Sequence, residues 1–149
     1  MATSTLVQFL SPGEKAPGGP NRSQVETFIA GGTIAAGDFV SLDTSKTGAD
    51  KVLYVIVVDT SGGAVALGVP TIGVALNAAT AGQDVTVVIR GYVGVANVAT
   101  GVAAGVAIAL DTTTSGRATT ADAANVNIAG ICLSLAASNK AEVFVNGQF

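Results

Sequence analysis

The chain has 149 residues, of which 49% are hydrophobic and only 11% are charged, and its formal net charge is −3. Ordinary soluble domains carry about 25% charged residues, so a solitary surface would leave apolar patches exposed, and such patches usually mark association. The net charge and the absence of any Lys/Arg cluster exclude nucleic acid as a partner, because neutralising phosphates requires a basic footprint. Composition therefore predicts an obligate component of a protein assembly.

Residues 1–24 differ in composition from the rest, since three of the four prolines fall there together with several glycines. Proline and glycine at this density prevent helices and strand ladders, so the sequence predicts an extended N-terminal arm. Phe9, Leu10 and Pro12 are predicted to be apolar anchors on a partner, with Arg22 as a polar contact. A disordered terminus is the alternative. The first ten residues carry no positive side chain and no long apolar run, unlike a signal peptide.

Residues 25–149 are predicted to form a β domain. Short runs of Val, Ile and Thr alternate with small residues, as is typical of strands, and no long pattern of helical period stands out. The predicted strands are Val52–Val58, Val85–Arg90, Val106–Leu110 and Ala141–Val145.

One stretch, Gly91–Leu110, has 20 residues without a charge and therefore matches the length of a membrane helix. It contains Asn97, Thr100 and four glycines, and its second half repeats a segment that carries Asp38. Polar residues and glycines make a membrane span unfavourable, so we expect no membrane partner.

An internal repeat is visible in the segments IAAGDFVSLD (34–43) and VAAGVAIALD (102–111), which lie 68 positions apart. Gly37 and Gly105 permit a tight turn before each predicted strand. The aspartates that end the strands are predicted to accept backbone N–H bonds in the next turn. Two positions in each strand should face the core by period-two alternation. These residues are Asp43 with Asp111, Val40 with Ile108, and Leu42 with Leu110; Gly48 and Gly116 close the two loops.

A second pair of segments completes the repeat, since Gly73–Gly91 resembles Gly130–Gly147 at an offset of 57 to 56. The first copy thus holds 11 extra residues, which we place in a longer hairpin over Tyr54–Val69. The sequence predicts two duplicated β-units, approximately 25–91 and 92–149. Each unit has one apolar side that it cannot bury alone, so the expected fold is an all-β protein, a small sandwich or barrel.

The sequence offers little catalytic chemistry. It contains no histidine, and neither a Ser-x-x-Lys nor a Gly-x-Ser-x-Gly motif is present. Cys132 is the only cysteine, and its apolar setting predicts an inert buried thiol. Single carboxylates at strand ends (Asp43, Asp50, Asp59 and Asp111) are interpreted as turn acceptors rather than metal ligands. We therefore predict a non-enzymatic protein with no metal, cofactor or small-molecule substrate.

A carrier domain is one alternative function. The segment 37–40 followed by Asp50, Lys51 and Val52 resembles lipoyl and biotinyl carrier domains, which display a modified lysine on a hairpin between two quasi-symmetric halves. The resemblance would make Lys51 the attachment site. The spacing to Lys51 is longer than in that family, and residues 47–49 replace the acidic residues expected there.

A broader resemblance covers roughly Thr33–Gly147. The motifs AAGDFVSLD (35–43) and IGVALNAATAGQDVTV (72–87), followed by Arg90 and Gly91, resemble tailed-phage capsid decoration proteins, also called cement proteins. That resemblance implies a non-enzymatic β protein, often a homotrimer, made in the host cytoplasm. It would bind the outer surface of an assembled head and lock neighbouring major capsid protein subunits together. A self-assembling fibre or surface-layer protein remains the structural alternative.

Overall fold

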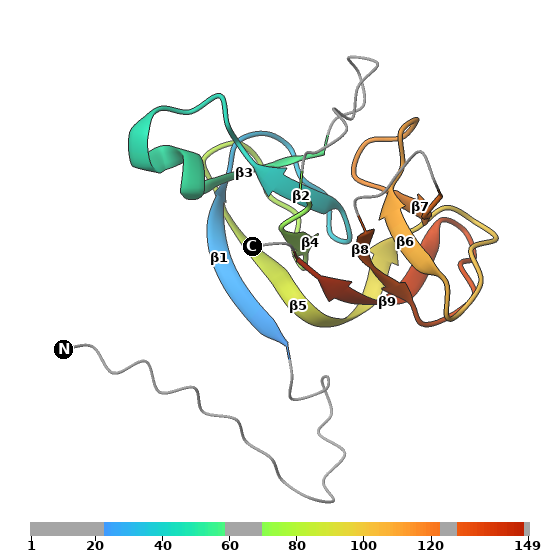
Figure 1. Cartoon of the computed structure of the whole chain (residues 1–149). Helices are drawn as coiled ribbons and strands as arrows, with labels where there is room; N and C mark the ends of the chain where they lie inside the picture. Colours follow the sequence, from blue (N-terminus) through green and yellow to red (C-terminus); the bar gives the residue numbers. More distant parts are fainter. Residues whose placement is uncertain (1–22, 59–69, 123–127, 148–149) are drawn as a thin grey trace, which may run out of the picture.

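The computed structural model describes residues 23–58, 70–122 and 128–147, and these ranges fold into β-strands and one short 3-10 helix (Figure 1). The elements are β1 (Gln24–Ala30), β2 (Phe39–Leu42), η1 (Gly48–Val52), β3 (Tyr54–Val57), β4 (Gly73–Ala75), β5 (Asp84–Asn97), β6 (Ala107–Leu110), β7 (Ala118–Thr120), β8 (Ile128–Cys132) and β9 (Lys140–Asn146). The predicted all-β class is confirmed.

The first part of the chain forms a closed barrel. Its strands are hydrogen-bonded in the order β1-β3-β2-β4-β5, and β1 also pairs antiparallel with β5, which returns the sheet to its start. We call these strands, with residues 84–90 of β5, the first barrel. Closure removes the exposed sheet edges, and it decides between the two predicted architectures in favour of the barrel.

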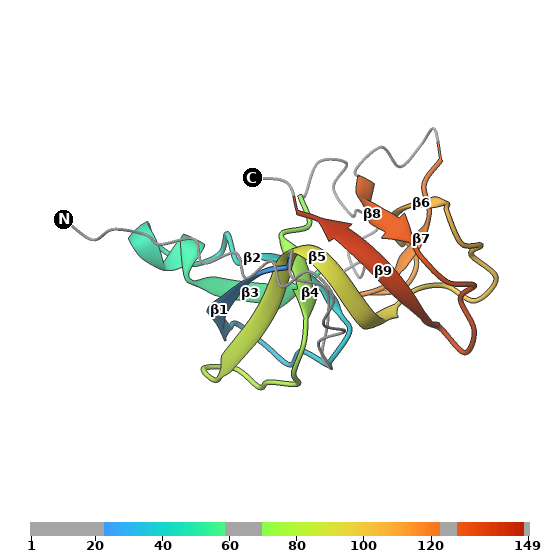
Figure 2. The same cartoon turned by 90° about the horizontal axis from the view of Figure 1, so that it is seen from below.

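The second part of the chain continues the same sheet in the order β5-β9-β8-β6-β7. An isolated parallel bridge between Val98 and Ala118 brings its last strand back to the end of β5. We call residues 91–97 of β5 together with β6 to β9 the second lobe. The first barrel and the second lobe lie side by side, with the long strand β5 common to both (Figures 1 and 2).

The internal repeat extends to the strand register. Each type of pairing in the first barrel recurs in the second lobe between the residues that the sequence repeat makes equivalent. The matching pairs are Ala30↔Val55 with Val98↔Ala118, Val40↔Gly73 with Ile108↔Gly130, and Val74↔Val88 with Ile131↔Phe144. The two predicted β-units are therefore duplicated in structure.

The extra residues of the first copy are not all where we predicted them. The offset between copies is 68 at Gly48 and Gly116, and it falls to 63 where Val55 of β3 corresponds to Ala118 of β7. Five extra residues therefore precede β3, in and after η1, and the rest fall between β3 and β4. The expected single hairpin over Tyr54–Val69 is wrong in this respect, because the first insertion forms a 3-10 helix.

The two hydrophobic cores are built from equivalent positions. The matched core residues are Phe28/Ala96, Ala30/Val98, Ile34/Val102, Val40/Ile108, Leu42/Leu110, Val55/Ala118, Ile72/Ala129, Ala75/Cys132, Ala79/Ala136, Val85/Ala141, Val87/Val143 and Ile89/Val145. All are buried except Leu42, which is half-buried against the core. The predicted core positions of β2 and β6 are thus confirmed. Several second-lobe residues are smaller than the first-barrel residues to which they correspond, so the core of the second lobe contains more alanine.

Strand β5 crosses the predicted boundary between the units. The prediction ended the strand at Arg90, whereas β5 continues to Asn97 and serves both halves of the molecule. At Gly91 the backbone has φ +129°, and a Cβ there would lie 2.5 Å from Ser23 Oγ, beside the start of β1. Glycine therefore lets the strand continue where β1 passes close to it. β1 itself begins at Gln24, the last residue of the predicted arm.

The uncharged stretch Gly91–Leu110 holds the second half of β5, a turn and β6 rather than a helix. Across the residues that the structure describes, no helix has the length and apolar character needed to cross a membrane.

Candidate interaction surface

The predicted arm residues Phe9, Leu10, Pro12 and Arg22 lie outside the described residues. Their proposed contact with a partner therefore stays a prediction. The site built below comes from β-strand positions that the sequence analysis did not single out.

The two turn aspartates do what the sequence predicts. Asp43 accepts the backbone N–H of Ser45 at 3.1 Å and its hydroxyl at 2.6 Å. Asp111 accepts the corresponding groups of Thr113 at 2.8 and 2.7 Å. Asp111 also binds Arg117, whose Nε and second guanidinium nitrogen lie 2.7 and 2.5 Å from Oδ2. Both turns are therefore structural.

These contacts shift the ionisation of the two carboxyls. The hydroxyl of Ser45 is the main cause that lowers the pKa of Asp43, with smaller help from Lys46. Burial raises the pKa of Asp111, but the hydrogen bonds from Thr113 and Arg117 outweigh burial and hold it below its ordinary value. Both aspartates are therefore ionised at neutral pH and occupied by local donors.

The outward face of the first barrel is covered by the second lobe. Phe39 and Val74 are completely buried and Val88 is 2% exposed, although all three point away from the barrel's own core. They belong to the same apolar cluster as the core residues of the second lobe. We call Phe39, Val74 and Val88 the covered face. Strand β2 is thus buried on both sides, because its neighbour Val40 fills the first core.

Backbone hydrogen bonds reinforce this contact. The amide of Phe39 donates to the carbonyl of Gly116 at 2.9 Å, and the amide of Gly116 donates to Val58 at 3.0 Å. Gly116 has φ +69°, and a Cβ there would lie 2.9 Å from Asp38 and Val57. The segment before β7 therefore docks on the ends of β2 and β3, and a side chain at position 116 would strain this contact.

A buried polar pair completes the junction. The side-chain amide of Asn97 donates to Asp38 Oδ1 at 2.5 Å, and the backbone amide of Ala35 donates to Oδ2 at 2.8 Å. Asp38 is only 9% exposed, so these donors replace the water that it loses. Its equivalent in the second lobe is Val106, which packs on the apolar cluster. The polar pair therefore belongs to the junction alone.

The equivalent face of the second lobe is open. The positions that correspond to the covered face are Ala107, Ile131 and Phe144, which lie opposite one another across β6, β8 and β9. Tyr92 of β5 continues the row beside Phe144. Directly paired residues share one face of a sheet. Ile131 is 45% exposed, and Leu133, two positions further on, is 43% exposed. We call these five residues the open face.

The charge near the open face is small. The hydroxyl of Tyr92 is hydrogen-bonded to Glu142, and burial together with this carboxylate raises the pKa of Tyr92. The phenol therefore stays protonated and its ring adds apolar area to the row. Glu142, opposite Leu133 on the same face of β9, is the charged side chain beside the row. A mainly apolar row with a charge at its edge is suited to binding another protein surface.

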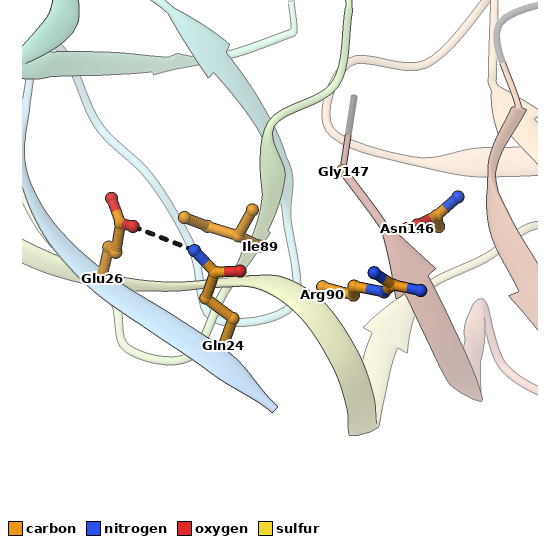
Figure 3. A pocket seen from close by; sticks show the side chains of 6 residues that line it. All are labelled: Gln24, Glu26, Ile89, Arg90, Asn146 and Gly147. Carbon is orange, nitrogen blue, oxygen red and sulfur yellow. Dashed lines mark hydrogen bonds between the residues drawn. The ribbon is translucent and has the colours of Figure 1, made fainter. Parts of the chain in front are cut away.

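A pocket of about 400 Å³ lies beside the first barrel, where β1 begins and β9 ends. Figure 3 shows Gln24 and Glu26 of β1 on one side and Arg90 and Asn146 on the other, with Ile89 between them. Gln24 donates to Glu26 at 3.2 Å. Its lining mixes one positive, one negative and two amide side chains, which indicates no single class of ligand.

The remaining candidate groups are placed as follows. Cys132 is fully buried, which confirms the predicted burial; its thiol lies 3.0 Å from the carbonyl of Ser134, and burial raises its pKa. Lys51 lies exposed in η1, within the first barrel rather than between two halves, unlike the hairpin lysine of the carrier resemblance. Among the described residues, no group of three or more His, Cys, Asp or Glu side chains is placed to hold a metal.

A signal for the open face was present in the sequence but was not recognised. The repeat aligns Ile131 and Phe144 with Val74 and Val88, so large apolar residues recur at outward positions of the second copy. Alternation alone does not say whether such positions are covered. Comparison of the sequence with protein-family models and with curated proteins finds no match.

Proposed function

We propose that this chain is a structural protein of a virion, which binds the outer surface of an assembled tailed-phage head and stabilises contacts between major capsid protein subunits. The observation that carries the proposal is the open face: a mainly apolar row beside a closed β-barrel, in a chain with very few charges. Exposed apolar area of this kind usually marks a site of association.

The proposed mechanism is added buried area across subunit boundaries. A standard protein interface buries about 1,600 Å² in total, and repetition over a shell multiplies modest contacts through avidity. Residues 1–24, with Phe9, Leu10 and Pro12, supply a further contact in this proposal, and the chain acts as a homotrimer on the head. Neither role requires a cofactor or a metal.

The test uses heads of a tailed phage that encodes this chain, prepared without it. Purified chain is added back, bound protein is quantified after sedimentation, and head disruption is followed by DNA release on heating. We expect saturable binding to the outer surface and a higher disruption temperature. Removing residues 1–20 should weaken binding. Heads that bind no chain, or bind it without any gain in stability, would contradict the proposal.

A self-assembling fibre is the second candidate, and one observation favours it. Only one of the two equivalent faces is open, so copies that associate through it need not meet symmetrically, and unsymmetrical contacts generate either rings or open filaments. Electron microscopy of the purified chain separates the two functions: closed small oligomers support the head-binding protein, whereas filaments of unlimited length support the fibre. A monomer with extra mass on Lys51 would instead support the carrier alternative.

A further inference from the structure

We propose that the open face of the second lobe binds the first barrel of another copy of this chain, in a head-to-tail arrangement. The proposal identifies the surface through which copies of the chain associate and the orientation of that contact. The biological meaning of this contact rests on the proposed function. Its test needs only the purified chain, so a failure to bind heads and a failure to self-associate are distinguishable.

The first argument is the internal precedent. The duplication places equivalent residues on the covered face and on the open face, at equivalent cross-strand positions. Within the chain, the covered face needs a whole second lobe to bury Phe39, Val74 and Val88. The open face carries Ile131 and Phe144 where the covered face has valines, and Ala107 where it has Phe39, so the bulk is shifted from β2 to β8 and β9 while the row stays apolar. A second copy of the same β body is therefore the partner whose shape already fits this kind of face.

The second argument is an exposed apolar segment on the first barrel. In the second lobe, the segment that leads into β7 docks on the covered face through Gly116. The segment that leads into β3 of the first barrel is its counterpart, and it includes the insertion in η1. Val52 and Leu53 in that segment are 59% and 50% exposed. We call these two residues the η1 tip.

The third argument is the loss of the polar pair. At the covered face the buried carboxylate of Asp38 accepts a hydrogen bond from half-buried Asn97, which replaces water that Asp38 loses. At the corresponding places the chain has Val106 and Ile29, which are half-buried and apolar. A contact between copies that repeats the internal one would bring two apolar residues together where the internal junction has a hydrogen bond. This replacement is consistent with an interface that forms without desolvating a carboxylate.

The direction of the contact has a consequence for assembly. Each chain has one open face on the second lobe and one η1 tip on the first barrel, so a head-to-tail contact leaves one of each unused in a dimer. Further copies add until a ring closes, or without limit if it does not. A symmetric contact between two open faces would instead stop at the dimer.

The experiment is sedimentation velocity of the full chain over a wide range of micromolar concentrations. The variants are Ile131→Lys on the open face and Leu53→Lys on the η1 tip, and the matched control is Leu76→Lys, which replaces an exposed leucine of the first barrel. Circular dichroism checks folding, and Leu133→Lys replaces Ile131→Lys if that variant does not fold. We expect the control to assemble like the unchanged chain, and each test variant to dissociate at roughly tenfold higher concentration or more, because the lysine ammonium would be buried.

Mixing the two test variants decides the direction. The Ile131→Lys chain keeps an intact η1 tip and the Leu53→Lys chain keeps an intact open face, so a head-to-tail contact predicts a dimer that forms only in the mixture. Three results would overturn the proposal: an unchanged chain that is monomeric throughout, an Ile131→Lys chain that still assembles, or a mixture that forms no dimer. A monomeric chain that assembles after removal of residues 1–22 would show that its own N-terminal segment covers the face, which also overturns it.

Discussion

The outward face of the first barrel and the equivalent face of the second lobe have the same strands in the same register, but only one of them is covered. Phe39, Val74 and Val88 are buried under the second lobe, whereas Ile131 remains 45% exposed. The second copy thus buries the outward apolar face of the first copy, while its own equivalent face is left exposed. The difference between the two faces indicates where further association is to be expected.

The largest expected effect is the loss of an anchor on the covered face. Phe39→Ala should lower the free energy of unfolding by about 3–5 kcal/mol, because a fully buried aromatic ring leaves a cavity between the two halves. Phe144→Ala is the matched control, since this half-buried ring lies on the open face, and we expect a loss of about 1–2 kcal/mol. Urea unfolding of the monomer measures both. Equal losses would mean that the two faces are covered alike.

The next effect concerns the glycines that close the two repeated loops. Gly116→Ala should destabilise the chain by about 2–4 kcal/mol, because the new Cβ meets Asp38 and Val57 at 2.9 Å and the left-handed backbone adds strain. Gly48 has φ +57° with open space around it, so Gly48→Ala should cost only the backbone strain, about 1 kcal/mol. Thermal unfolding of both variants provides the comparison. A Gly48 variant as unstable as the Gly116 variant would refute the docking role assigned to Gly116.

A smaller effect is expected at the polar pair of the junction. Asp38→Ala leaves the amides of Ala35 and Asn97 without their acceptor, which should cost about 1–3 kcal/mol. Val106→Ala, at the equivalent position, removes only part of a half-buried apolar side chain and should cost about 1 kcal/mol. If Asn97→Ala in the Asp38→Ala background costs as much as in the unchanged chain, the two side chains are not coupled.

The smallest expected effect separates the two turn aspartates by pH. Because the pKa of each folded carboxyl is lowered, each contributes stability above its unfolded pKa of about 3.9, and this contribution is lost as the pH falls through the folded pKa. Asp111 binds Arg117 at 2.5 Å, whereas Lys46 lies 3.7 Å from Asp43. Asp111→Asn should therefore flatten the acid decline of stability more than Asp43→Asn does.

This comparison is read from unfolding midpoints between about pH 6 and pH 2. The Asp43→Asn variant is the control, since its turn has the same shape and lacks the guanidinium contact. If Asp43→Asn flattened the acid decline of stability more than Asp111→Asn, the ion pair with Arg117 would add nothing beyond the hydroxyl and amide hydrogen bonds that both aspartates accept.

Most of the local structure could be predicted from the sequence. The turns at Gly37 and Gly105 have φ +92° and +83°, and the strand ends at Asp43 and Asp111 bind the next turn as expected. These features depend on residues that are close in sequence, and each occurs in both copies of the repeat. The prediction that all the extra residues of the first copy lie in one hairpin was wrong partly because Val52 was assigned to a strand, whereas it lies in η1.

The candidate site could not be predicted in the same way. Period-two alternation separates the two faces of a strand, but it does not say what lies against the second face. Phe39 and Ile131 both occupy outward positions, and only their distance from the other half of the molecule decides that one is buried. The arm residues chosen from composition lie outside the described residues, and their contacts remain predictions; they are Phe9, Leu10, Pro12 and Arg22.

By itself, the sequence determined that this protein is all-β, is poor in charge and repeats one β-unit, because periodicity, composition and turn chemistry are local properties. Only the tertiary structure decided that the first unit closes into a barrel, that β5 serves both halves and that the repeated face is covered once and open once. These features arise from pairing between residues far apart in the chain, such as Gln24 with Arg90, which no local pattern specifies.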